Sequence, residues 1–438
     1  MKENQKAIES AQQVLTLARE TKNSWAEAIA LDTLSRTYSS LGDAQKTLEF
    51  AQQALEVARQ IKNNFLAGRA LAFLGDAYTL IGEVRKALDF AQQGLVIARE
   101  LKNRNLEAVN LIILGNAYNF MGDHRKALDF AQQGLAIARE LKKPSVELLA
   151  LSTLGRAYKS LGDYQKSIEF LQYNLAIARE IRDRNSEAVA LVNLSTAYDS
   201  LEDYQKAIEL LQQSLAIVRE IQDRRLEAQA LGNLSDIYKS FNDYEKALEV
   251  ANQGLVIAKK IQNPQVLIRS LLSLFTIYES LRNYPKIVEI SHQSVAIAQK
   301  LENPQLEAVT LAMRSMAYFY QGDTQKTIEF AQQSLAIADK GKSQLAKGIA
   351  LTVLSVSYGE LRNYKKAVEL SKQSLTVAKE LHDRDLERGT LNILGAIYRR
   401  AGQKEQAIAA YQEVLATVGE GASDTSRATA QGGLEGTS

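Results

Sequence analysis

Side chains that could carry out acid–base or metal chemistry are few and scattered in this sequence. It contains three histidines, His124, His292 and His382, and no cysteine in 438 residues. The histidines occupy unrelated positions of the repeat described below, whereas a metal or acid–base role needs neighbouring groups within reach. We interpret all three as solvated surface residues, and we expect no catalytic residue, no metal site and no cofactor.

One short motif has the composition of a phosphate-binding loop. Gly341, Lys342 and Ser343 match its last residues, but Ala336 stands where the first glycine of the loop belongs. No strand is predicted before it, and the loop needs one to present backbone N–H groups to a phosphate. We therefore predict no nucleotide site, and we do not expect the chain to be an enzyme.

The elements that must position any site follow from a repeat of forty residues. Tyrosine recurs at this interval from Tyr38 to Tyr398, and leucine from Leu31 to Leu391, without a change of register. Self-similarity at a fixed period of this size is the signature of a solenoid, in which each unit packs only on its neighbours. Fold and function must therefore be inferred from one unit and its variations.

Each unit contains two helical patterns. In residues 144–183 the first pattern, helix A, runs from about Val146 to Ser160 with apolar residues at helical spacing. Helix A is expected to end at Gly162, because glycine readily adopts the left-handed conformation at a helix C-terminus. Asp163 is expected to cap the N-terminus of the next helix. The second pattern, helix B, runs from about Tyr164 to Ile181.

The unit resembles the tetratricopeptide repeat. Leu154, Gly155, Tyr158, Gly162 and Ser167 match the signature of that family in order. The usual repeat has about 34 residues, and the longer period here is similar to the repeats of spindle-orientation adaptors, kinesin light chains and bacterial signalling proteins. The resemblance implies an all-α fold, a right-handed solenoid superhelix of antiparallel helix pairs, with a concave face lined mainly by helix A.

The repeat pattern also predicts the domain organisation. Residues 1–22 match helix B without a preceding helix A, and residues 23–418 hold ten helix pairs of one solenoid. From residue 419 to 438 the sequence is rich in glycine and poor in large apolar side chains, so we expect a flexible tail or linker and no capping helix. Uncapped ends would favour homo-oligomers through exposed helix faces.

Composition limits the partners. Lysine and arginine number 53 against 51 aspartates and glutamates, a balance that gives no general attraction to nucleic acid or an anionic membrane. The first residues are polar and do not form a signal peptide, and no apolar run approaches the ~18 residues of a membrane span. We expect a cytoplasmic protein that binds a protein or peptide, and neither nucleic acid nor membrane.

Helix A positions that packing does not need vary between repeats, and they are the candidate binding residues. They lie one, five and eight residues after the recurrent leucine, and in the first repeats they combine both charge signs with asparagine. Such side chains suit recognition of an extended peptide, although each could equally be a solvated charge on a helix face. The predicted groove residues are Arg36, Asp76, Asn116, Asn119, Arg156, Lys159, Asp199, Asp236 and Lys239.

A second candidate locus lies in the irregular stretch from Pro264 to Gln344. Arg314 replaces the leucine found at every equivalent site, and bulky side chains accumulate beside it. The stretch is either a distorted joint that forms a partner pocket or sequence drift absorbed by local repacking. Its candidate residues are Arg314, Met316, Phe319 and Tyr320.

Three functional hypotheses follow from the sequence. The first is a non-enzymatic protein–protein interaction scaffold that holds an extended peptide or partner segment in its concave groove. The second is a regulatory or sensor arm of a larger signalling protein with a protease, ATPase or kinase domain, as in bacterial arrays that the repeats resemble. The third is a structural solenoid that assembles with itself end to end.

Overall fold

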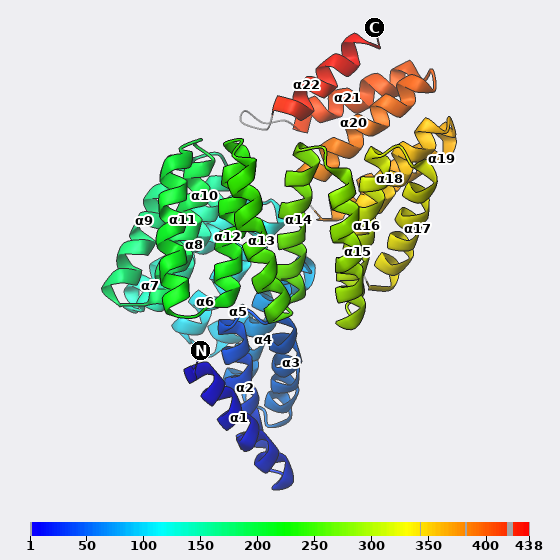
Figure 1. Cartoon of the computed structure of the whole chain (residues 1–438). Coiled ribbons are helices and arrows are strands. Elements are labelled where there is room, and N and C mark those ends of the chain that lie inside the picture. The colour runs from blue at the N-terminus through cyan, green and yellow to red at the C-terminus, as the bar shows by residue number, and fades with distance from the viewer. Residues whose placement is uncertain (1, 342, 382, 418–423, 438) are drawn as a thin grey trace. The chain divides into compact units, whose positions relative to one another are not determined.

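The computed structural model describes residues 2–341, 343–381, 383–417 and 424–437, and all regular structure in them is helical (Figure 1). The predicted all-α solenoid of antiparallel helix pairs is confirmed. None of the described helices combines the length and apolar character that a membrane crossing requires. The chain divides into two compact units, Met1–Leu226 and Glu227–Ser438, and α12 contributes residues to both.

The helices that begin in the first unit are α1 (Lys2–Glu20), α2 (Ser24–Ser40), α3 (Ala44–Gln60), α4 (Asn64–Leu80), α5 (Val84–Glu100), α6 (Arg104–Met121), α7 (His124–Glu140), α8 (Pro144–Ser160), α9 (Tyr164–Glu180), α10 (Arg184–Asp199), α11 (Tyr204–Glu220) and α12 (Arg224–Ser240). Those of the second unit are α13 (Tyr244–Ile261), α14 (Pro264–Ser280), α15 (Tyr284–Lys300), α16 (Pro304–Tyr320), α17 (Thr324–Gly341), α18 (Gln344–Glu360), α19 (Tyr364–Leu381), α20 (Arg384–Arg400), α21 (Lys404–Thr417) and α22 (Asp424–Glu435). Even-numbered helices from α2 to α20 are the A helices, and the odd-numbered helices are the B helices.

The turn inside each pair has the predicted chemistry. Gly162 has a φ of 81°, in the left-handed region, and the side chain of Asp163 accepts a hydrogen bond from the backbone N–H of Lys166. The same geometry recurs where the glycine is missing, because Arg282 is held at a φ of 52°. A left-handed conformation costs an L-residue roughly 1–2 kcal/mol that glycine does not lose.

We therefore predict that Arg282→Gly stabilises the second unit. The expected gain is roughly 0.5–1 kcal/mol, because relief of strain is offset in part by the greater freedom of glycine in the unfolded chain. Arg282 is exposed, so no packing is lost. Urea unfolding measures the gain. The converse change, Gly162→Arg, should lower stability, and an unchanged midpoint for both variants would show that these turns carry no strain.

The recurrent tyrosine of helix A packs on an aromatic ring of helix B. Tyr158 is stacked on Phe170 with ring centroids 5.3 Å apart, and Lys166 Nζ lies 5.3 Å from the centre of the tyrosine ring. The same arrangement of lysine, tyrosine and phenylalanine occurs at Tyr38, Tyr78, Tyr118 and Tyr318. Stacking and the cation–π contact explain why this column does not vary.

Ion pairs join several repeats to the next, as between α9 and α10. Arg179 near the end of α9 donates to Glu187 in the first turn of α10, at 2.9 Å, and Arg184 donates to the same carboxylate at 2.6 Å. Burial raises the pKa of Glu187, whereas the hydrogen bonds and charges of the two arginines lower it. Their combined effect is larger than that of burial, so the pKa of Glu187 lies below its usual value. The first-turn glutamate therefore interacts favourably with the dipole of α10 and also links α9 to α10 across the repeat boundary.

The A helices approach one another more closely than the B helices do. Successive A helices contact each other from α2 to α10 and again from α14 to α20, besides packing on their own B helices. For the described residues, no comparable contact joins successive B helices. A stack whose A helices are closer together curves toward them, so the A helices line the inner face of each unit.

The C-terminal tail is not the flexible segment that the sequence predicted. Helix α22 packs against α20 and α21 (Figure 1), with Ala430 fully buried and Leu434 in an apolar cluster that contains Tyr411. Ala430 and Leu434 lie in the forty-residue columns of Ala30 and Leu34, so α22 is an A-type helix. Its Arg427 and Gln431 are exposed, so a helix with a polar outer face covers α20 and α21 where we expected no capping helix. Residues 418–423 lie outside the described part.

Candidate binding site on the inner face of the first unit

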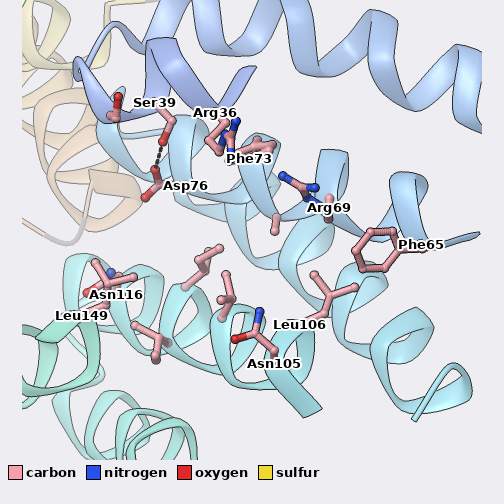
Figure 2. Close-up of a pocket in the computed structure, with 15 residues that line it drawn as sticks. Arg36, Ser39, Phe65, Arg69, Phe73, Asp76, Asn105, Leu106, Asn116 and Leu149 are labelled. Atoms are coloured by element: carbon pink, nitrogen blue, oxygen red, sulfur yellow. Dashed lines mark hydrogen bonds between the residues drawn. The ribbon is translucent and has the colours of Figure 1, made fainter. Parts of the chain in front are cut away.

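A pocket of about 550 Å³ opens on the inner face of the first unit (Figure 2). Side chains from α2, α4, α6 and α8 line it, so four consecutive A helices build one site. Its floor is apolar and includes Ala72, Ile112 and Ile113, which are all buried. Pockets of about 300–1,000 Å³ with apolar walls and a few polar groups are the usual size and character of binding sites.

Two large apolar side chains at this pocket are exposed. Phe65, in the first turn of α4, is 42% exposed, and Leu149 of α8 is 52% exposed. Figure 2 shows them at opposite ends of the pocket, with Arg36 between them. The pocket thus has an exposed apolar side chain at each of its two ends.

The carboxylates at this face are already balanced by neighbours. Asp32 is buried and forms a 3.0 Å ion pair with Arg69, and its other oxygen has no hydrogen-bond partner. Asp76 accepts a 3.1 Å hydrogen bond from Ser39 (Figure 2). Burial raises the pKa of both carboxyls, against the lowering effect of Arg69 on Asp32 and of Ser39 and Arg156 on Asp76.

The amide of Asn116 joins two repeats. Its Oδ1 accepts hydrogen bonds from Thr153 at 2.7 Å and from Arg156 at 2.6 Å, both on α8. Burial lowers the pKa of Arg156, and the charge of Asp76 opposes this, so the guanidinium lies near that carboxylate too. Arg156 thus contributes to the contact between repeats more than to a free binding surface.

Arg36 differs from the other charged residues at the pocket. It lines the pocket and is exposed, and it makes no hydrogen bond or ion pair with any residue of the described part. Its charge acts on Asp32 only at longer range, where it helps to lower the pKa of that carboxyl. Arg36 therefore lines the pocket without an ion pair in the part of the chain that the structure describes.

The structure brings only part of the predicted groove together. Arg36, Asp76 and Asn116 line the pocket, and Arg156 bonds to Asn116. Asn119 instead lies 2.7 Å from Nδ1 of His124 in its own repeat. Lys159 and Asp199 do not line the pocket, and neither is free of a partner.

The two predicted groove residues of the second unit are also engaged between repeats. Asp236 accepts a 3.3 Å hydrogen bond from Ser273, and Lys239 donates to Thr276 at 3.2 Å. Burial raises the pKa of Asp236, and the nearby charges of Arg269 and Lys239 oppose this effect. Variation of these positions along the sequence thus reflects different hydrogen bonds between repeats as well as any role in binding.

The second predicted locus is split between two sets of neighbours. Arg314 is 6% exposed, donates from Nε to Ser291 at 3.2 Å, and lies over the ring of Phe330. Tyr320 instead donates to Glu279 and stacks on Tyr284 with ring centroids 5.0 Å apart. Burial and the bond to Glu279 raise the pKa of Tyr320 above its usual value.

The remaining two residues of this locus take part in packing. Met316 packs against the apolar core, and Phe319 meets the ring of Tyr320 edge to face. The contacts of the four residues therefore support local repacking of the core more directly than a shared partner pocket.

The apolar residues of the site, Phe65 and Leu149, are not among the residues predicted from the sequence. The predicted groove positions lie one, five and eight residues after the recurrent leucine, whereas Phe65 and Leu149 lie six and two residues before that leucine. All these positions are spaced so that they fall on one face of helix A. The available signal was a large aromatic residue at Phe65, where the following repeats have Asn105 and Ser145.

The histidines do not form a cluster in the described residues. His124 begins α7 and bonds to Asn119, while His292 is exposed on α15, where burial and the charge of Arg314 lower its pKa. His382 and Lys342 lie outside the described residues. Within the described part, no three histidine, cysteine, aspartate or glutamate side chains are grouped so that they could hold a metal.

Tandem helical hairpins with contacts between successive A helices define an α-solenoid protein. The family model of the tetratricopeptide repeat matches residues 66–140, 147–220, 201–260 and 348–418, more than half of the chain. The chain belongs to the tetratricopeptide repeat family, as the motif at Leu154 to Ser167 indicated. No curated protein sequence matches it significantly.

Solved structures are similar to this chain at low identity. The crystal structure of Rap protein complexed with competence and sporulation factor is 16% identical, with a TM-score of 0.53 over 87% of this chain and 97% of that chain. A putative kinesin light chain of Podosopora anserina with nearly identical TPR-like repeats is 24% identical, with a TM-score of 0.35 over 44% of this chain and 95% of that chain. At 16% identity the likeness to Rap protein concerns the fold alone.

Proposed function

We propose that this chain is a non-enzymatic interaction scaffold that holds an extended peptide or partner segment on the inner face of its first unit. The observation that carries the proposal is the pocket built by four A helices, with the exposed Phe65 and Leu149 at its ends and the unpaired Arg36 between them. Apolar anchors around a single available charge are typical of surfaces that bind protein segments.

The proposal agrees with the architecture in two further respects. A solenoid presents an extended concave surface, and this is the surface that such proteins use for binding. Rap protein, which shares the fold, was crystallised in complex with competence and sporulation factor. A fold of this kind can therefore hold a second molecule.

Removal of the apolar anchors should abolish capture of a partner. We expect Phe65→Ser combined with Leu149→Ser to reduce recovery of a specific partner at least about tenfold, since loss of two exposed apolar contacts removes on the order of 2 kcal/mol. The measurement is affinity capture from an extract of the source cell, followed by quantitative mass spectrometry. Circular dichroism should show unchanged helicity, because both side chains are exposed.

A matched pair of exposed apolar residues outside the pocket provides the control. Val96 of α5 is 47% exposed and Tyr173 of α9 is 54% exposed, and neither lines the pocket. Val96→Ser combined with Tyr173→Ser should capture the same proteins as the wild type. Equal loss in both double variants, or no loss in either, would contradict a binding role of the pocket.

A further inference from the structure

Around the pocket, one positive charge has no ion-pair partner among the residues that the structure describes. Asp32 is paired with Arg69, and Asp76 is hydrogen-bonded by Ser39 and lies near Arg156. Arg36 has no such partner among the residues that the structure describes. A ligand that lies in the pocket therefore meets apolar walls and one free guanidinium, which hydrogen-bonds best to a carboxylate.

The order of these groups along the groove is defined by the helices that carry them. Phe65 lies at one end of the pocket and Leu149 at the other, and Arg36 projects between the two (Figure 2). A segment that covers both apolar side chains must therefore pass Arg36 midway. The exposed amide of Asn105, on the side of the pocket opposite Arg36, is available for the backbone of such a segment.

The geometry points to a ligand in which an acidic side chain is flanked on both sides by large apolar side chains, bound as an extended segment of a partner protein. This inference rests on the proposed function and adds to it the chemistry and the order of the recognised residues. The acidic side chain pairs with Arg36, and the flanking side chains cover Phe65 and Leu149. An internal segment fits better than a chain end, because the apolar surface continues on both sides of Arg36.

A phage-displayed library of random peptides, selected on the wild-type protein, tests the inference. We expect enrichment of peptides with aspartate or glutamate between aromatic or long aliphatic residues. Selection on Arg36→Glu should instead enrich lysine or arginine between the same apolar residues. For one enriched wild-type peptide, Arg36→Glu should weaken affinity about tenfold or more, and replacing the acidic residue of the peptide by lysine should restore it.

Two further variants separate the inference from the proposed function. Arg36→Ala removes the charge without adding repulsion near Asp32, and Arg85→Glu reverses an exposed arginine of α5 that does not line the pocket. Arg36→Ala should weaken binding of the acidic peptide, and Arg85→Glu should leave it unchanged.

The outcomes are distinct. Enriched peptides that need Phe65 and Leu149 but show no charge preference would overturn the acidic ligand and leave the proposed function intact. Peptides insensitive to both the Arg36 and the Phe65 and Leu149 variants, or a failure to enrich any peptide, would overturn both.

Discussion

Arg314→Leu is expected to stabilise the second unit by roughly 1–3 kcal/mol. Arg314 is buried between helices, it has no carboxylate within ion-pair distance in the described part of the chain, and burial lowers its pKa. A buried charge without a counter-charge loses its hydration without full compensation, and an apolar residue of similar size avoids that cost. Leucine already occupies the equivalent sites at Leu274 and Leu354, where it is buried.

The loss of the hydrogen bond to Ser291 should not cancel this gain. The hydroxyl of Ser291 also donates to the backbone carbonyl of Val288 at 2.7 Å, so it remains satisfied after the substitution. Urea unfolding monitored by circular dichroism measures the change. Arg314→Lys keeps the charge but loses the planar contact with Phe330, and it should destabilise the unit. A lower midpoint for Arg314→Leu would show that the guanidinium is fully compensated.

Gly155→Ala is expected to destabilise the first unit by roughly 1–3 kcal/mol. A Cβ atom at Gly155 would lie 2.5 Å from Cγ of Leu171, whose side chain is 1% exposed and cannot move aside. Overpacking of this kind separates α8 from α9, and it outweighs the better helix propensity of alanine, about 1 kcal/mol. The effect should appear in the same unfolding experiment.

A glycine with free space around it provides the matched control. At Gly232 of α12 the nearest atom to an added Cβ is Nε of Arg269, at 3.6 Å, so Gly232→Ala should be neutral or stabilising by up to about 1 kcal/mol. In addition, Leu171→Ala should remove the steric conflict at Gly155. The double variant should then be more stable than the sum of the two single effects, and strict additivity would contradict a direct clash.

The fold was predictable because packing repeats. The columns of Leu154 and Tyr158 recur at forty-residue intervals with few exceptions, such as Arg314, so they report helix pairs and turns directly. Helix α22 was missed because only Ala428, Ala430 and Leu434 keep the column identities, and Gln431 and Gly432 hide the apolar pattern. Arg427 and Gln431 are exposed, and α22 therefore shows a weaker apolar periodicity than the other A helices.

The site was predictable only in part, because its contacts join different repeats. Ser39 bonds to Asp76, and Asn116 bonds to Thr153, each 37 residues further along the chain. Comparison of the repeats in the sequence shows that these positions vary. It does not show which polar residues form hydrogen bonds between neighbouring repeats. Which charge remains free after this pairing, here that of Arg36, follows only from the arrangement of the helices.

The central claim, that the pocket of the first unit holds a partner segment between Phe65 and Leu149, is tested most directly by site-specific photo-crosslinking. A photoreactive phenylalanine analogue at position 149 is irradiated with a peptide selected on the wild-type protein, and the products are mapped by mass spectrometry. The exposed Tyr173 of α9, outside the pocket, is the control position. We predict efficient crosslinks from position 149 and background from position 173. Equal crosslinking from both positions, or none from position 149, would contradict the claim.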